Sequence, residues 1–82
     1  MLAIARNEKQ LAAALRRSRK LASLTQTDLA VAVDKRQATI SNLESGAGGT
    51  LETLFAVLAA LELELVVRPR RKADTPGLGD LF

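Results

Sequence analysis

The segment from Asp34 to Gly46, DKRQATISNLESG, concentrates side chains that form hydrogen bonds at close range. Lys35 and Arg36 precede a run of short amides and hydroxyls, and the only large aliphatic residues in it are Ile40 and Leu43. Short amides and hydroxyls can pair with the edges of nucleic acid bases, and an alanine methyl can contact the methyl group of thymine. If Ile40 and Leu43 anchor the segment as a helix, the residues left on its outer face are Gln37, Ala38, Ser41 and Ser45.

Little in the sequence supports catalysis or metal binding. There is no Cys and no His, so disulfides, thiolate metal sites, the usual general base and the commonest metal ligand are all absent. Glu62 and Glu64 alternate as they would on one face of a strand, and exposure to solvent explains them better than a catalytic carboxylate pair. We therefore expect a protein that is not an enzyme and that uses neither a metal nor another cofactor.

Positive charge is concentrated in the first half of the chain. Residues 1–36 carry eight Lys or Arg against three acids, residues 37–67 carry four Glu and no base, and residues 68–82 carry four bases and two acids. The first part is therefore suited to an anionic partner. Arg16, Arg17 and Lys20 in it form either an ordinary solvated helix face or, as a group, contacts to phosphates.

Hydrophobic periodicity predicts three helices in the first part of the chain. The first covers about Asn7 to Ala22, with an apolar stripe beside a basic remainder. A capping box formed by Thr25 and Asp28 begins the second helix, which covers residues 26–33. The third covers residues 37–45 and is followed by a glycine that can end it.

A fourth helix is predicted after Thr50, which is placed to cap it, and Glu52 in its first turn complements the helix dipole. Its spacing predicts a buried face of five residues: Leu51, Leu54, Phe55, Leu58 and Leu61.

The second and third helices form a helix-turn-helix pattern, because a capped helix of about eight residues is joined to another short helix by a three-residue turn. Asp34 can adopt the left-handed conformation of such a turn at modest cost. Ala30, one turn earlier, is small enough for the point where the two helices approach most closely. This pattern predicts that the outer face of residues 37–45 enters a DNA major groove.

The stretch LRRSRKLASLTQTDLA followed by QATISNLESG resembles the Xre family of Cro/C1-type repressors, over about Leu11 to Leu61. The later LETL and LELEL segments narrow the resemblance to HipB-like antitoxins, which pair with a HipA-like kinase toxin. The resemblance implies a mainly α fold: a four-helix, lambda-repressor-like domain over residues 1–67, with one C-terminal strand and a flexible tail over residues 68–82.

The resemblance also implies residue roles in DNA binding. Gln26 would hold a phosphate and brace Gln37, the first residue of the recognition helix, and Thr27 would face the backbone or the groove edge. Base reading is implied for Arg36, Ala38 and Ser41, and phosphate contact for Thr39 and Asn42. Arg19 and Glu44 would form an internal ion pair rather than contact DNA.

The sequence departs from the family pattern at Ser23, Asp34, Lys35 and Arg36. Asp34 replaces the usual turn glycine, and Ser23 lies where a glycine is common. Lys35 and Arg36 replace an aliphatic residue and a capping Ser or Thr, which adds positive charge beside the groove, so we include Lys35 among the expected DNA contacts.

The segment from Leu61 to Val67 alternates with period two and is the most strand-like part of the chain. A lone strand would leave backbone groups unpaired, and pairing with the same segment of a second copy would satisfy them. The residues expected to form this homodimer strand are Leu61, Leu63, Leu65 and Val67. The alternative is that the segment simply extends the fourth helix.

The tail from Arg68 onward is expected to be largely disordered, yet its sequence finishes on apolar residues. Leu78, Leu81 and Phe82 are expected to form a short motif that docks on a partner protein, the alternative being a terminus without a role. The basic cluster of Arg68, Arg70, Arg71 and Lys72 either contacts flanking DNA or keeps the segment soluble.

The resulting hypothesis is a homodimeric, sequence-specific repressor that reads a palindromic operator with half-sites about 34 Å apart. Following the resemblance, it would be the antitoxin of a HipBA-type module that represses its own operon and neutralises a kinase toxin. The alternative is a stand-alone Xre-type regulator without a toxin partner. No apolar run approaches membrane-spanning length, so we expect a soluble, intracellular protein. The resemblance to bacterial repressors implies a cytoplasmic, nucleoid-associated bacterial protein.

Overall fold

The computed structural model describes residues 2–71, which contain four helices. These are α1 (Glu8–Leu21), α2 (Gln26–Ala32), α3 (Gln37–Ser45) and α4 (Leu51–Ala60). All four predicted helices are confirmed, with ends within two residues of those expected. Residues 72–82 lie outside the described part of the chain, and with them the predicted docking residues Leu78, Leu81 and Phe82.

Three of the four helices begin at a side chain that caps them. Asn7 accepts a hydrogen bond from the backbone N–H of Gln10, and Thr50 accepts one from the N–H of Thr53. Thr25 and Asp28 form the predicted capping box, in which each side chain accepts from the backbone N–H of the other. Such caps satisfy backbone donors that a helix cannot pair internally, which fixes where each helix starts.

All four helices end in a residue with a left-handed backbone followed by a 6→1 hydrogen bond, the pattern of a Schellman motif. The left-handed residues are Ser23 (φ 61°), Asp34 (φ 56°), Gly46 (φ 81°) and Glu62 (φ 58°). The closing bonds run from Leu24 N to Arg19 O (3.2 Å), Lys35 N to Ala30 O (2.9 Å), Ala47 N to Asn42 O (3.0 Å) and Leu63 N to Leu58 O (2.7 Å). Only one of the four positions is a glycine.

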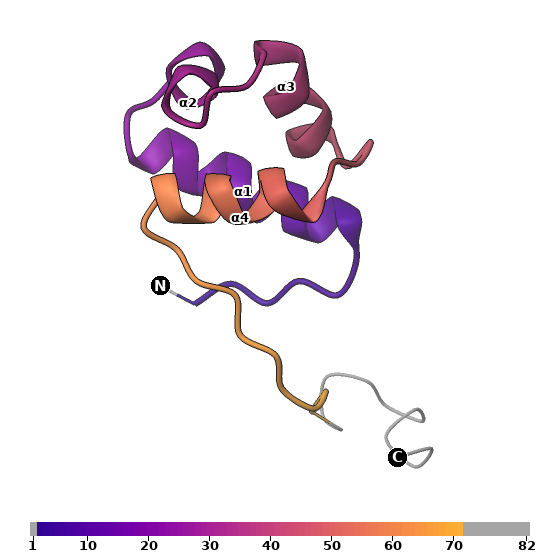
Figure 1. The fold of residues 1–82 in the computed structure, drawn as a ribbon. Helices are drawn as coiled ribbons and strands as arrows, with labels where there is room; N and C mark the ends of the chain where they lie inside the picture. Colours follow the sequence, from indigo (N-terminus) through magenta and orange to yellow (C-terminus); the bar gives the residue numbers. More distant parts are fainter. Residues whose placement is uncertain (1, 72–82) are drawn as a thin grey trace.

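The helices form two layers around one aliphatic core. In Figure 1, α2 and α3 lie on one side and α1 and α4 on the other, and both ends of the described chain leave from the side of α1 and α4. α3 packs against α1 and α2, and α2 also contacts α4. The core contains Leu15, Leu29, Ala30, Ile40, Leu54, Val57 and Leu58.

The predicted buried face of α4 is partly wrong. Thr53, Leu54, Val57 and Leu58 are buried, whereas Leu51 and Phe55 are 72% and 52% exposed. α4 is apolar on almost every side, so its periodicity does not define which side faces the core. The residues left exposed form an apolar surface on α4.

The segment after α4 forms no strand in the single chain, within the described residues. Leu61 is the C-terminal cap of α4 and Glu62 is left-handed, so the expected strand cannot begin at Leu61 and α4 does not continue through the segment. Residues 63–71 have no regular secondary structure. Within the described residues, no strand pairs with residues 64–67 in the single chain, so a ladder there would have to come from a second chain.

Candidate nucleic-acid interface

The turn between α2 and α3 is fixed by backbone hydrogen bonds rather than by a glycine. Asp34 adopts the predicted left-handed conformation, and the N–H groups of Asp34 and Lys35 donate to the carbonyls of Val31 and Ala30. Ala30 is 3% exposed, as expected for a small residue between two crossing helices. This turn sets the angle at which α3 stands out from the core.

α3 turns its aliphatic residues inward and its short polar residues outward. Ile40 is fully buried and Leu43 packs against the core. Gln37, Ala38, Asn42 and Ser45 are exposed, while Thr39 and Ser41 are half-buried. The outer face of α3 therefore presents the amides, hydroxyls and methyl group that the sequence placed there.

Arg36 begins α3 with an extended backbone but forms no side-chain cap. The first-turn N–H groups of α3 are therefore left without a side-chain acceptor, and such groups favour phosphate oxygens. Lys35, by contrast, turns toward α4, where its Nζ lies 3.2 Å from Glu52 Oε1. Because Glu52 is largely exposed, this pair contributes little stability and Lys35 can exchange it for another anion.

A continuous set of hydrogen bonds connects the buried interior to the first residue of α3. Arg19 donates from Nε and Nη2 to the two carboxylate oxygens of Glu44, at 2.6 and 2.9 Å, and from Nη1 to the carbonyl of Leu24 at 2.7 Å. Gln26 Nε2 donates to Glu44 Oε1 at 3.2 Å, and Gln37 Nε2 donates to Gln26 Oε1 at 2.8 Å. We call Arg19, Glu44, Gln26 and Gln37 the bracing network.

The bracing network fixes the charge state of its buried members. Burial alone raises the pKa of the Glu44 carboxyl, but hydrogen bonds from Arg19 and Gln26, with the charges of Arg19 and Arg16, outweigh it and hold the pKa below its ordinary value. The hydrogen bond to Glu44 raises the pKa of Arg19 in turn. Both side chains are more than nine-tenths buried, and they are charged and paired at neutral pH.

The structure thus joins four of the expected residues, Arg19, Glu44, Gln26 and Gln37, in one network. Gln26 braces Gln37 through a direct hydrogen bond, and Arg19 and Glu44 form the expected ion pair. The sequence did not reveal the hydrogen bond from Gln26 to Glu44, which joins the two pairs into one network. No spacing rule predicts it, since residues 26 and 44 meet only through the packing of α2 against α3.

A family model described as helix-turn-helix matches residues 15–67, which is more than half of the chain. The chain belongs to the helix-turn-helix family. It is of the Xre, or Cro/C1, type, so the chain carries a helix-turn-helix DNA-binding domain, and α2 and α3 are the two helices that give this family its name.

Solved structures of HipB resemble the chain along most of its length. A chain of a HipA–HipB–O2–O3 complex is 34% identical with a TM-score of 0.77, and the match covers 85% of this chain and all of that one. A HipB–O4 20mer complex gives 34% identity and a TM-score of 0.79, covering 85% and 100% of the two chains. A HipB–O1–O2 complex gives 35% and 0.76, covering 83% and 100%. No curated protein shows significant sequence similarity.

Two further observations concern residues 2–71. They contain no group of three or more acidic, Cys or His side chains that could hold a metal ion. None of their helices has both the length and the apolar character needed to cross a membrane.

Proposed function

We propose that this protein is a sequence-specific transcriptional repressor that binds duplex DNA through α3. The observation that carries this proposal is the outer face of α3, on which Gln37, Asn42 and Ser45 are exposed, while the side chain of Gln37 is hydrogen-bonded to the bracing network. A helix that enters the major groove needs such a face, because base edges are read by short side chains held in fixed positions.

We assign residue roles as the family resemblance implies. Gln37 and Ala38, which are exposed, and Ser41, which is half-buried, would read bases together with Arg36 at the start of α3. Phosphate contacts are assigned to the residues around this face, Gln26, Thr27, Lys35, Thr39 and Asn42. The uncapped N-terminus of α3 adds backbone donors for a phosphate.

The direct test compares base preference between variants. A site selected by the purified protein from random duplexes should bind Gln37→Ala and Ser41→Ala more weakly by about 1–3 kcal/mol for each base interaction removed, with relaxed preference at one position each. Gln10→Ala makes the same amide-to-methyl change on α1 and should bind like the parent. Parent-like binding by both α3 variants would show that α3 is not the reading helix.

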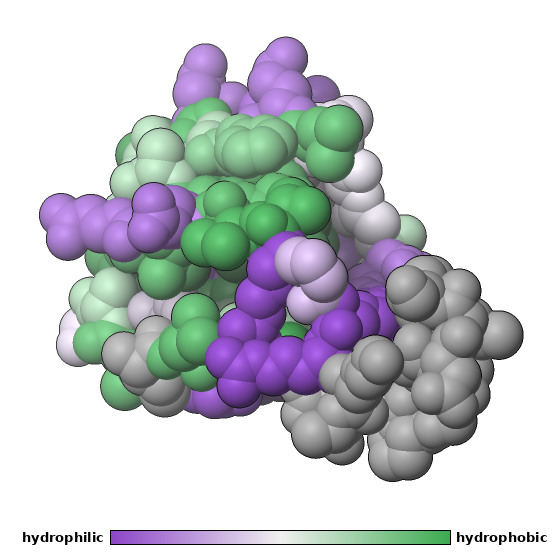
Figure 2. Space-filling model, turned by 90° about the horizontal axis from the view of Figure 1, so that it is seen from below, coloured by the Kyte–Doolittle hydropathy of each residue, from purple (hydrophilic) through white to green (hydrophobic). Residues whose placement is uncertain are grey.

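The second part of the proposal is a homodimer. Leu51 and Phe55 on α4 continue into Leu63, Leu65, Val66 and Val67, all more than a third exposed. Figure 2 shows the underside of the molecule, where α4 and the chain ends lie in Figure 1, and apolar residues gather on it. A second copy covering this surface could also pair its backbone with residues 63–67.

The third part is a role as the antitoxin of a HipBA-type module that represses its own operon in the bacterial cytoplasm. Its support is the similarity to HipB, which is found together with HipA in one of the matching complexes. Leu78, Leu81 and Phe82 would dock on a HipA-like kinase. The alternative function is a stand-alone Xre-type regulator, which the same α3 surface would serve equally well.

Deleting residues 78–82 separates these alternatives. In an antitoxin the deletion should weaken capture of a HipA-like kinase encoded beside it while leaving the DNA affinity of the free dimer unchanged. Loss of kinase binding and DNA binding together would argue against a separate docking tail. No kinase binding by the full chain would leave the stand-alone regulator as the better description.

A further inference from the structure

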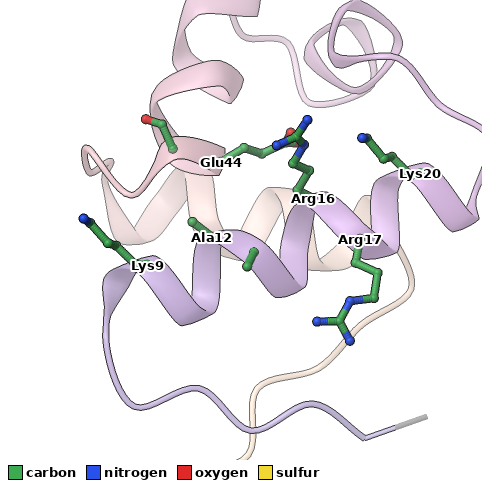
Figure 3. A pocket seen from close by; sticks show the side chains of 8 residues that line it. Lys9, Ala12, Arg16, Arg17, Lys20 and Glu44 are labelled. Carbon is green, nitrogen blue, oxygen red and sulfur yellow. The ribbon is translucent and has the colours of Figure 1, made fainter.

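A shallow groove runs along α1 where it faces the C-terminal end of α3, and four cations border it. Its lining includes Lys9, Arg16, Arg17 and Lys20 of α1, the small residues Ala12 and Ala13 between them, and Glu44 and Ser45 of α3. Figure 3 shows Lys9, Arg16 and Lys20 directed toward the side of α3, whereas the guanidinium of Arg17 points the opposite way. We call Lys9, Arg16 and Lys20 the α1 stripe.

The position of Lys9 is tied to the end of α3. A Cβ added to Gly46 would lie 3.1 Å from Lys9 Cγ and 3.4 Å from its Cα, so the stem of Lys9 passes close to the residue that ends α3. Ser45, on the exposed side of α3, borders the same groove. The α1 stripe therefore adjoins the C-terminal end of the outer face of α3.

Within the described residues, no salt bridge is formed by Lys9, Arg16 or Lys20. The one carboxylate in the groove, Glu44, is held at short range by Arg19, and Arg16 acts on it only through its charge. Arg16 and Lys20 lie four positions apart on one helix, where like charges are destabilising. A nearby anion would relieve this repulsion.

The spacing of the stripe suits a regular polyanion. Lys9 to Lys20 is eleven residues, about 16 Å of helix at 1.5 Å per residue. Duplex DNA offers phosphates along each strand about every 3.4 Å of axis, so the stripe spans about five of them. The two alanines keep the groove low between the cations, which lets a backbone lie close to α1.

We infer that the α1 stripe receives the phosphate backbone of the duplex beside the segment read by α3. This inference rests on the proposed function and extends its footprint to a helix outside the helix-turn-helix pair. The stripe touches no base, so it adds affinity and salt dependence without sequence preference.

The test is the salt dependence of binding to a duplex site selected by the parent protein. Replacing Lys9, Arg16 and Lys20 together by Gln should make the negative slope of log affinity against log salt less steep. The expected change is about 0.9 for each phosphate that is no longer neutralised, hence about 2.7 per protomer. The order of preference among single-base variants of the site should stay unchanged. Arg17→Gln removes the same charge from the adjacent position, and its slope should match the parent.

Each outcome decides one point. An equal slope for the triple variant and Arg17→Gln overturns the inference. The inference is also overturned if the triple variant no longer binds a HipA-like partner but keeps the parent's slope, because the stripe would then be a protein-binding surface. An altered order of base preference would also overturn it, because the stripe would then position α3. A parent protein that selects no sequence refutes the proposed function itself, an outcome distinct from all of these.

Discussion

At the scale of single residues, Glu44 determines which atoms Gln37 can offer to a base. A carboxylate only accepts hydrogen bonds, so Gln26 must turn its Nε2 toward Glu44 and its Oε1 toward Gln37. Gln37 must therefore donate from Nε2, which leaves its Oε1 and one N–H free. An oxygen and an N–H side by side match the N6 and N7 edge of adenine.

Glu44→Gln should therefore weaken a preference for adenine without removing a residue that touches DNA. A glutamine at this position can donate or accept, so the amides of Gln26 and Gln37 are free to reverse. In selection from random duplexes, the preference that disappears in Gln37→Ala should decrease in Glu44→Gln, while preferences at other positions persist. Unchanged adenine preference in the folded variant would show that Gln37 is oriented by the DNA alone.

The Glu44 carboxylate also makes folding stability depend on pH. The pKa of Glu44 is lower in the folded state than in the unfolded state. At pH values between these two pKa values the unfolded state binds more protons, so folding stability falls as the pH decreases. The contribution is complete above the unfolded pKa of about 4.3 and is lost as pH falls through the folded value. Denaturant titrations should show a shallower acid decline for Glu44→Gln. An equally steep decline would assign it to other carboxyls.

Asp28 also contributes to the loss of folding stability at low pH, in the parent protein and in Glu44→Gln alike. Hydrogen bonds from the backbone and hydroxyl of Thr25 lower the pKa of its carboxyl. This contribution is present in the parent and in Glu44→Gln alike, so the difference between the two proteins isolates Glu44.

At the scale of elements, the helix ends carry backbone strain that glycine would relieve. Ser23 is left-handed and exposed, and it closes α1 at a position where the Xre pattern often has a glycine. Ser23→Gly should stabilise the fold by up to about 1 kcal/mol, because the strain removed exceeds the entropy that glycine adds to the unfolded chain. A melting temperature higher by about 4–8 °C would be the corresponding signal.

Two matched substitutions test that reasoning at neighbouring positions. Ala22→Gly places a glycine where φ is −82°, so it adds unfolded-state entropy without relieving strain and should destabilise by about 0.4–1 kcal/mol. Gly46→Ala introduces a Cβ at φ 81° and 3.1 Å from Lys9 Cγ, and it should destabilise as well. If Ser23→Gly and Ala22→Gly shift the melting temperature in the same direction, left-handed strain is not what limits stability.

What the sequence could predict at this scale depends on how local the signal is. Thr25 and Asp28 are three residues apart, and their capping box was found because it needs no tertiary information. The exposed Leu51 and Phe55 were misplaced because an apolar helix can turn any side to the core. The left-handed Glu62 gave no signal, since neither glycine nor asparagine marks it.

At the scale of the whole molecule, the described part of the single chain has an exposed apolar surface on α4 that continues into residues 63–67, which form no strand. Leu65 is 49% exposed in a segment without regular structure, shortly after Leu63, whose N–H closes the end of α4. That closing bond holds the start of residues 63–67 against the body of the domain. A second copy can then meet both surfaces at once, which would place two α3 helices on one face of a duplex.

Leu65→Asp should therefore convert the proposed dimer to a monomer, because it places a charge in the middle of the expected pairing segment. Val31→Asp makes a comparable change at an exposed aliphatic residue of α2, outside that segment, and should leave the mass in solution unchanged. The monomer should keep the base preference of one half-site. It should lose the gain in affinity that a dimer obtains by binding two half-sites at once, because that gain depends on the high effective concentration of the second α3. Sedimentation together with binding to whole and half sites measures both effects. A dimer that persists in Leu65→Asp would move the interface from residues 63–67 to α4 alone.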